Sequence, residues 1–457
     1  MLTKKILLSK KNLLLVSLFF VTTFLLHFQH KFSSDEGVII NGAWNIYNGK
    51  KLYVDFFEYI SPGSFYFVYL IFLLFGPSYT PVKIISVIFL LITALLIYKI
   101  SRLLELDEKI SKITSLLWLI ITSAAYPLIN HNTYSTFLVI FLSYTFILFI
   151  KKRNKNLIFI SGILAALTFY FLQTKGFFII ISLILFLLIY LRKDKKTIYY
   201  LLYFILGLLT IFIPGYIFWG DIVITAPFLI SKNYLEINQT SYVWIILFTF
   251  LTVASWWFLK KQKNLNIYIY ILLTVQVCLF LSILNLPDIY HIILNAFPLI
   301  LILSVLLRHN LYKLKLLYYS KIIKAVLLIS ISILYLVIFS KFLTNLSASL
   351  KTKNYFSSLQ KTIGQEEIFS HPFMPGLYFE LKKENPYYTN VIETIQGNKI
   401  FLMKNFEILN KHKPKYILTE YNIALNFGYE KNIIDYYIFN NYRPLKKYQH
   451  IILWEKK

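Results

Sequence analysis

Two pairs of acidic residues stand near the start of the chain, within one polar stretch. Asp35 and Glu36 form the first pair, and Asp55 and Glu58 form the second. A carboxylate within hydrogen-bond reach of a hydroxyl group can act as its general base. The same residue types also serve as ordinary helix caps or as solvated loop acids, and the loop position of Asp55 and Glu58 favours solvation. Both a catalytic and a structural interpretation of these four acids therefore stay open.

Further polar side chains stand at the ends of apolar stretches. Lys175 lies in Gln173-Thr-Lys-Gly, His131 lies between two asparagines, and His291 follows Asp288. An ammonium group can meet a phosphate, whereas histidine and asparagine can orient sugar or phosphate oxygens. Lys175 also fits a snorkelling lysine at a membrane interface, and a lone interfacial histidine is often a satisfied polar residue.

The composition indicates what kind of protein must position these groups. The chain has 457 residues, of which 58% are hydrophobic and 15% are charged, and its mean hydropathy is +0.62. A soluble globular protein carries about 25% charged residues. Long apolar runs recur, as in Leu13–Leu26 and Ile84–Tyr98. We therefore exclude a soluble enzyme and predict a polytopic membrane protein. The single cysteine, Cys278, provides no disulfide framework and no cysteine-based metal site.

The apolar runs predict about eleven transmembrane helices in an all-α membrane domain. The start of the chain resembles a signal peptide but lacks a small-residue cleavage site, so we predict an uncleaved first span. The expected location is the plasma (inner) membrane, with a cytoplasmic N-terminus and an extracytoplasmic C-terminus. The predicted spans cover residues 12–28, 80–100, 113–128, 135–150, 157–172, 177–191, 198–218, 243–259, 267–284, 291–307 and 321–341.

One further apolar segment, Pro62–Gly76, is short. A helix of about 14 residues covers about 21 Å, whereas the hydrocarbon core of a bilayer is about 30 Å thick. If this segment does not cross, most clusters of Lys and Arg fall on the cytoplasmic side, as the positive-inside rule expects. We therefore predict an interfacial or re-entrant helix on the outer face. The formal net charge of +26 is then a signal of topology and not of nucleic-acid binding.

The last part of the chain differs in character from the rest. Its charges are spread evenly, and apolar patterns predict strands at 367–370, 416–419 and 450–454 and an amphipathic helix at 401–412. We predict a small extracytoplasmic α/β domain over residues 345–457. The transmembrane domain covers residues 1–344, and its outer loop 29–79 carries interfacial helices.

The first outer loop predicts a helix of its own. Ser33-x-x-Glu36 matches a capping box, and Gly49 ends the helical pattern. We expect the helix to lie flat at the membrane interface, with both acids of the first pair in its first turn. The capping box also accounts for Glu36 without any catalytic role. The apolar face consists of Ile39, Ile40, Ala43, Trp44 and Tyr47.

The order of motifs in this loop resembles a family of membrane enzymes. The first acidic pair is followed by Gly49-x-x-x-Tyr-x-Asp, then Ser61-Pro-Gly, an apolar stretch and Phe75-Gly-Pro-Ser. This order resembles the polytopic glycosyltransferases of the C-type fold that use lipid-phosphate sugars. Dolichyl-phosphate-mannose protein mannosyltransferases and bacterial aminoarabinose transferases are members of this family. Further similarities are Gln173-Thr-Lys-Gly, the segment 288–298 and the outer domain with its Lys413-Pro-Lys-Tyr-Ile-Leu.

The resemblance implies a donor of the polyprenyl-phosphate-sugar type that enters from the outer leaflet. It implies that Asp35 is the general base toward the acceptor hydroxyl or its orienter, with Glu36 as an orienting partner. Transfer would proceed with inversion, and Lys175 would meet the donor phosphate. Three further side chains would line the pocket: Asp55, His131 and His291.

The second outer loop departs from the family pattern. Many relatives carry an acid there, whereas this chain has Asn130, His131 and Asn132. Nothing in the spacing of Asp35, Glu36 and the histidines requires a divalent ion. We therefore predict no required cofactor and assign no metal site, and a divalent ion stays an open alternative.

Two other functions stay open. A transporter or flippase for lipid-linked sugars would need a polar path through the bilayer, and no Asp or Glu falls inside a predicted span. A non-catalytic scaffold for envelope assembly would use Asp35 only as a helix cap. The expected partners are a polyprenyl-phosphate-linked sugar, a glycan, lipid or protein acceptor, and membrane lipids, but no nucleic acid.

Overall fold

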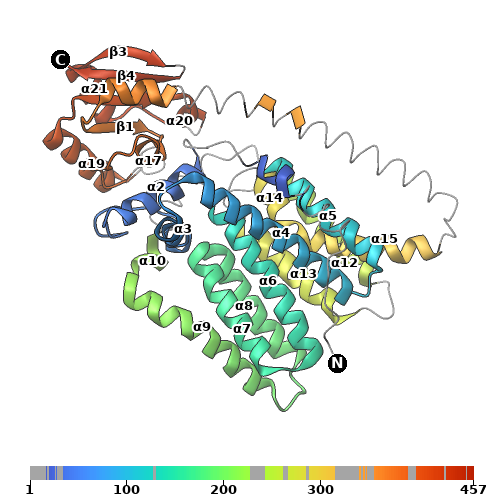
Figure 1. Ribbon diagram of the computed structural model, residues 1–457. Helices are drawn as coiled ribbons and strands as arrows, with labels where there is room; N and C mark the ends of the chain where they lie inside the picture. The colour runs from blue at the N-terminus through green and yellow to red at the C-terminus, as the bar shows by residue number, and fades with distance from the viewer. Residues whose placement is uncertain are drawn as a thin grey trace.

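The computed structural model describes residues 34–126, 130–226, 242–260, 266–284, 288–313, 355–389, 398–426, 429–448 and 450–457, with scattered residues in 17–27 and 339–346. Helices form a bundle, and a small sheet lies beyond the end of the bundle at which α2 and α3 are found (Figure 1). The prediction of a mostly helical protein with a small C-terminal sheet is confirmed. The predicted spans 12–28 and 321–341 lie largely outside the described residues.

Helices occupy the predicted spans from 80–100 to 291–307. Two shorter helices precede them, in the first outer loop. The bounds are α2 (Asp35–Tyr47), α3 (Pro62–Phe75), α4 (Tyr79–Leu103), α5 (Glu108–Ala125), α6 (His131–Lys152), α7 (Lys155–Phe171), α8 (Gln173–Tyr190), α9 (Thr197–Trp219), α10 (Ile222–Thr225), α12 (Tyr242–Lys260), α13 (Ile267–Ser282), α14 (Ile289–Asn295) and α15 (Phe297–Lys313).

Several of these helices suit a membrane environment. Within the described residues, α4, α6, α8 and α9 are long and apolar enough to cross a bilayer, and the bent pair α14–α15 is a fifth if it counts as one span. Apolar side chains on α9 point outward, and Ile198 and Ile217 are 72% and 79% exposed. Exposed apolar surface of this extent fits contact with lipid. The chain is thus a multi-pass membrane protein, whereas the count of about eleven spans stays a prediction.

The predicted span 291–307 is bent. α14 ends at Asn295, α15 begins at Phe297, and the two helices form an angle of 60°. Pro298 stands in the first turn of α15, where its missing N–H is tolerated. In a continuous helix its ring would clash with the carbonyl group of Leu294. The prediction of one continuous helix is therefore corrected to two helices with a break.

The short apolar segment is the 14-residue helix α3. Pro62 occupies its first turn, and Gly76, with φ of 80°, ends it. Apolar side chains at its C-terminal end are exposed, among them Leu74 at 74% and Phe75 at 60%. Its length is as predicted, and its interfacial or re-entrant placement stays a prediction.

Helices α7 and α9 approach each other closely at two glycines. A Cβ atom on Gly162 would lie 2.2 Å from the carbonyl oxygen of Phe204, and one on Gly207 would lie 2.1 Å from that of Phe159. Small residues of this kind let the backbones of membrane helices come into contact. The pair Gly162 and Gly207 therefore determines how closely the two helices pack.

We expect Gly207→Val to destabilise the helical bundle. Overpacking costs about 1–3 kcal/mol, and here the obstacle is a backbone carbonyl that cannot rotate aside. The measurement is the thermal unfolding midpoint of the purified protein in detergent. Leu206→Val is the control, because Leu206 on the same helix is 51% exposed. An unchanged midpoint for Gly207→Val would contradict the close approach of α7 and α9.

The C-terminal part forms a four-stranded sheet in the order β1-β2-β4-β3. β1 (Ile368–Pro372) is parallel to β2 (Tyr416–Glu420), and β4 (Ile451–Lys456) is antiparallel to β2 and to β3 (Tyr442–Tyr448). The three predicted strands are confirmed, and the predicted helix is α19 (Lys399–His412). Four helical stretches of the described C-terminal residues were not predicted: 355–363, α17 (Leu377–Glu380), α20 (Asn422–Asn426) and α21 (Ile433–Asn441).

This sheet has an apolar core of its own and a buried polar network beside it. The Asp435 carboxylate accepts hydrogen bonds from Tyr421 and Tyr429, both at 2.6 Å, and lies 3.0 Å from His371 Nε2. Burial alone would raise the pKa of Asp435, but His371 and the two tyrosines hold it at about 2. The network joins β1 to α21. The domain boundary at residue 344 stays a prediction.

Candidate active site

Helix α2 places the first acidic pair at its N-terminus, as predicted. It begins at Asp35 with Ser34 as the N-cap residue and ends before Gly49, whose φ is 87°. Carboxylates in the first turn favour the positive end of the helix dipole. The acids therefore have fixed positions at the start of a 13-residue helix.

Helix α2 is covered by protein on more than its predicted apolar face, whereas its placement at the membrane interface stays a prediction. Residues 36–46 of α2 are all buried. α3 covers one side, where a Cβ atom on Gly42 would lie 2.4 Å from the ring of Phe65. The C-terminal part covers another side, where the ring of Phe379 lies 5.8 Å from that of Trp44. The pattern of one helix does not show what packs on its polar side.

Asp35 meets the start of α6. Its Oδ2 atom accepts a hydrogen bond from Asn130 Nδ2 at 3.2 Å, and the same amide donates to the hydroxyl of Tyr126 at 2.6 Å. The Oδ1 atom of Asn130 caps α6 by accepting from the backbone N–H of Asn132 and Thr133. The Asn130 carboxamide is thus fixed by its own helix and holds the carboxylate in place.

A chain of polar groups continues from this point to α14. The Nδ2 atom of Asn132 lies 3.1 Å from His131 Nε2 and 3.2 Å from His291 Nε2. His291 Nδ1 lies 2.9 Å from Asp288 Oδ1, which also caps α14 through the backbone N–H of His291. With the Nδ1 proton of His291 donated to Asp288, its Nε2 atom accepts from Asn132. Asp35, His131 and His291 are therefore brought together from three segments, and their roles in a reaction stay predictions.

The protonation of Asp35 responds to this environment. Burial raises the pKa of the partly buried Asp35 carboxyl, Asp288 adds to the increase, and His291 and the hydrogen bond from Asn130 oppose it. A carboxylate whose pKa is raised is a stronger base than an ordinary aspartate once it is ionised. The cluster thus suits proton acceptance by Asp35.

Lys175 is buried in the first turn of α8. Its side chain is 0% exposed, and its Nζ atom donates to Thr136 Oγ1 at 3.0 Å. No carboxylate within the described segments lies at ion-pair distance from it. Thr136 lies one turn along α6 from Asn132, about 6 Å at 1.5 Å per residue. The buried position excludes the interpretation of Lys175 as a snorkelling surface lysine.

Glu36 does not join the Asp35 cluster. It is 1% exposed, and its Oε1 atom forms an ion pair with Lys83 Nζ of α4 at 2.5 Å. A buried charge of this kind needs an opposite charge beside it. This ion pair attaches α2 to α4, and the role of Glu36 as an orienting partner of Asp35 stays a prediction.

The two acids of the second pair, Asp55 and Glu58, lie in different environments. Asp55 is exposed and accepts a hydrogen bond from the backbone N–H of Lys51 at 2.8 Å, within a surface turn. The structure does not bring it to the Asp35 cluster. Glu58 is 1% exposed, so the prediction of a solvated loop acid is wrong for this residue. The neighbouring Phe56 and Phe57, also buried, were the signal that this loop packs inward.

Two carboxamides on α2 were not predicted as site residues. Asn41 and Asn45 are 0% and 1% exposed, and within the described segments the Asn41 amide and the Asn45 Nδ2 atom have no hydrogen-bond partner. A buried polar group without a partner costs about 1–3 kcal/mol and calls for an explanation, such as a ligand or a water molecule. Two asparagines one helical turn apart among apolar residues are the pattern that could have identified them.

The side chains do not form a metal site in the described part of the chain. No three residues of the types His, Cys, Asp and Glu come close enough there to hold an ion. The imidazoles of His131 and His291 are separated by the carboxamide of Asn132, whose Nδ2 atom lies near both rings. The site is thus a cluster of hydrogen-bonding groups that includes the carboxylates of Asp35 and Asp288.

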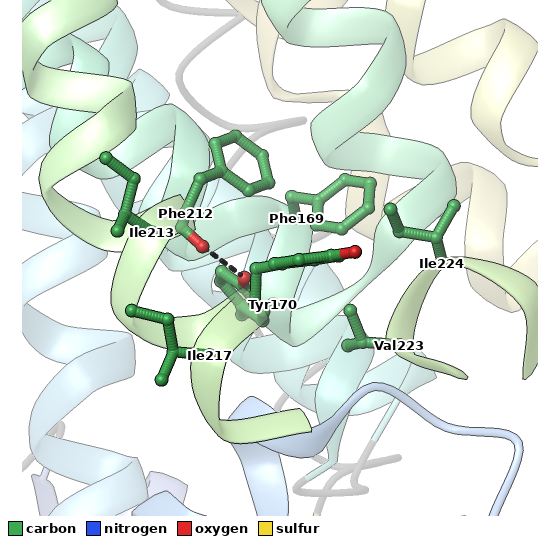
Figure 2. Close-up of a pocket in the computed structure, with 8 residues that line it drawn as sticks. Phe169, Tyr170, Phe212, Ile213, Ile217, Val223 and Ile224 are labelled. Carbon is green, nitrogen blue, oxygen red and sulfur yellow. Dashed lines mark hydrogen bonds between the residues drawn. The ribbon is translucent and has the colours of Figure 1, made fainter. Parts of the chain in front are cut away.

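An apolar groove lies where α7 and α9 end (Figure 2). Its volume is about 290 Å³, and α10 forms one wall. That wall is tied to the start of α8, because Gln173 Nε2 donates to the carbonyl group of Val223 at 3.0 Å. The groove is thus adjacent to the turn that carries Lys175. Its lining consists of Phe169, Tyr170, Phe212, Ile213, Tyr216, Ile217, Val223 and Ile224.

Comparison with known proteins supports the resemblance stated above. A comparison with curated proteins gives no match. The family described as dolichyl-phosphate-mannose-protein mannosyltransferase matches residues 60–219, which extend from the start of α3 to the end of α9. This stretch includes Asn130, His131 and Lys175 but not Asp35. The predicted resemblance is therefore confirmed, and over residues 60–219 this membrane protein is similar to the dolichyl-phosphate-mannose-protein mannosyltransferase family of glycosyltransferases.

Proposed function

We propose that this protein is an integral-membrane glycosyltransferase that moves a sugar from a polyprenyl-phosphate donor to an acceptor hydroxyl on the extracytoplasmic face. The observation that carries the proposal is the Asp35 carboxylate, held by Asn130 beside a chain of imidazoles and carboxamides. The family match over residues 60–219 supports the reaction class. The N-terminus is cytoplasmic and the C-terminal sheet extracytoplasmic in this proposal.

Asp35 acts as the general base. It takes the proton of the acceptor hydroxyl while that oxygen forms a bond to the anomeric carbon. The bond between that carbon and the phosphate oxygen breaks on the opposite face, so the anomeric configuration inverts and polyprenyl phosphate leaves. The carboxamide of Asn41 and the imidazole of His131 offer hydrogen bonds to sugar hydroxyls.

Two parts of the donor, its phosphate and its prenyl chain, bind at two neighbouring places. Lys175 provides a positive charge for the leaving phosphate. Its buried ammonium group donates a hydrogen bond to the hydroxyl of Thr136, and no carboxylate of the described residues neutralises its charge, so an anion can bind there. The apolar groove beside α10 accepts part of the prenyl chain (Figure 2). Its position next to Gln173 supports one continuous path from the prenyl chain to the phosphate.

The reaction class is tested with the purified protein in nanodiscs. Polyprenyl-phosphate sugars extracted from the host are added together with an acceptor-rich membrane extract, and mass spectrometry follows donor loss and polyprenyl phosphate formation. We expect the wild-type protein to consume one donor and release polyprenyl phosphate in equal amount. Unchanged donor would contradict a transferase and favour a transporter or an envelope scaffold.

The pH dependence of transfer should report on Asp35. The base must be ionised, so the rate falls as the pH decreases through the raised pKa of Asp35, above the ordinary value of about 3.9. Asn130→Ser keeps a capping oxygen for α6 but withdraws a hydrogen bond that favours the charged carboxylate. The pKa then rises further, and the acidic limb of the pH–rate profile moves to higher pH.

Asn154→Ser is the matched control for this measurement. Asn154 caps α7 in the same way, through the backbone N–H of Asn156. This variant should retain the wild-type profile. An acidic limb that stays in place in Asn130→Ser would show that Asp35 is not the titrating base.

A further inference from the structure

The C-terminal part of the chain contacts α2 at the end opposite to Asp35. The contacts come from a short stretch that begins within α17 and continues past its end, residues 379–388, which we call the clamp segment. Its first residue, Phe379, is 2% exposed although it precedes a surface turn. It belongs to the same buried apolar cluster as Ile39, Ala43 and Phe72 of the first outer loop. Phe379 is thus packed into the loop, whereas Leu381 and Tyr387 of the same segment pack into the core of the sheet.

Aromatic contacts centre on the Phe379 ring. Its centroid lies 5.8 Å from that of Trp44 on α2, 5.4 Å from that of Phe72 on α3 and 5.2 Å from that of Tyr79 at the start of α4. Aromatic pairs at such distances contribute about 0.5–1.5 kcal/mol each beyond the area that they bury. One side chain therefore joins three helices of the membrane part.

Directional hydrogen bonds add to this packing. Trp44 Nε1 donates to the carbonyl group of Lys383 at 2.8 Å, and the Lys50 ammonium donates to that of Asn385. The backbone N–H of Phe57 donates to the carbonyl group of Tyr388 at 2.6 Å. Each of these bonds ends on the backbone of the clamp segment. These bonds fix the rotation of the clamp segment relative to the first outer loop as well as the distance between them.

Helix α2 connects these contacts at Trp44 to Asp35. Trp44 and Asp35 are nine residues apart on α2, about 13 Å along a continuous helix. The start of α2 is fixed by the hydrogen bond between Asp35 and Asn130, by the ion pair between Glu36 and Lys83 and by apolar packing of Val38. A rotation or shift of the Trp44 end would therefore change the position of the Asp35 carboxylate.

We infer that the clamp segment positions the general base, with Phe379 as the main positioning residue. This inference rests on the proposed function, because it assigns the C-terminal part a role in the same transfer reaction. The extracytoplasmic sheet is then a component that completes the active site of the membrane part. A misplacement of about 1 Å at a reacting group can cost about a hundredfold in rate.

The test uses full-length protein in nanodiscs. Phe379→Ala should lower kcat about ten- to a hundredfold with the KM for the donor unchanged. Hydrogen–deuterium exchange of peptides from residues 35–47 should become at least about tenfold faster in the same variant. Phe379→Leu retains apolar bulk and should recover most of both properties.

Controls separate positioning from general destabilisation. Phe406→Ala removes a ring that packs on Tyr437 inside the C-terminal part, and it should leave kcat and the exchange of α2 at wild-type values. Wild-type exchange of α2 or wild-type kcat in Phe379→Ala would overturn the inference. Full transfer by Asp35→Asn would instead refute Asp35 as the general base, and a lack of transfer by the wild-type protein would refute the proposed function. Neither result would change the exchange protection of α2 by Phe379.

Discussion

Replacement of Asp35 by Asn should abolish sugar transfer and leave the fold intact. The carboxamide retains the shape of the side chain and can still form a hydrogen bond with Asn130. It cannot take a proton from the acceptor hydroxyl, and loss of a general base costs roughly a hundred- to ten-thousandfold in rate. Burial disfavours the charged form of Asp35, and the neutral carboxamide of the variant removes this cost. The variant should therefore be at least as stable as the wild-type protein.

The measurement is the initial rate of polyprenyl phosphate release, with the thermal unfolding midpoint recorded on the same sample. Asp55→Asn is the matched control, because Asp55 carries the same charge but lies in an exposed turn of the same loop. We expect it to transfer sugar at the wild-type rate. Equal losses in both variants would show that the loop needs its negative charge and not a base at Asp35.

Removal of the Lys83 charge should have the largest effect on stability. In Lys83→Met the Glu36 carboxylate stays buried but loses the ammonium group 2.5 Å away. Breaking a buried ion pair from one side costs roughly 3–5 kcal/mol. We expect a clear decrease in the denaturation midpoint in detergent, with transfer lost as α2 detaches from α4.

A second substitution tests the role of Glu36. Glu36→Gln combined with Lys83→Met removes both charges, so most of the lost stability should return. Transfer should return with it if Glu36 only holds α2 in place. Lys112→Met is the control, because Lys112 pairs with Glu108 on an exposed helix surface, where solvent screens the ion pair and its contribution to stability is small. A stable double variant without transfer would give Glu36 a chemical role.

Local patterns predicted the elements of this protein well. The helix that begins at Asp35, the short helix α3 and three of the four strands follow from periodicity and from turn residues that act over a few positions. The fourth strand, β3, was missed because it contains Pro444 and mostly exposed side chains. It is an edge strand, where proline is tolerated and no buried face imposes an alternating pattern.

Contacts between distant segments could not be predicted in the same way. Asp35 and Asn130 are 95 residues apart, and Glu36 and Lys83 are 47 residues apart. The sequence marks each of these side chains as polar, but it does not state which of two neighbouring acids turns toward which helix. The different roles of Asp35 and Glu36 therefore come from tertiary packing, as does the burial of Glu58 beneath its aromatic neighbours.

The most direct test of the account is a single-turnover experiment with wild-type protein and Asp35→Asn in identical nanodiscs. Each is loaded with the same polyprenyl-phosphate sugar, unbound donor is removed, acceptor is added, and mass spectrometry follows the bound lipid. We predict that both proteins retain the donor and that only the wild-type protein converts it to polyprenyl phosphate. Conversion by Asp35→Asn at the wild-type rate would contradict the assignment of Asp35 as the general base.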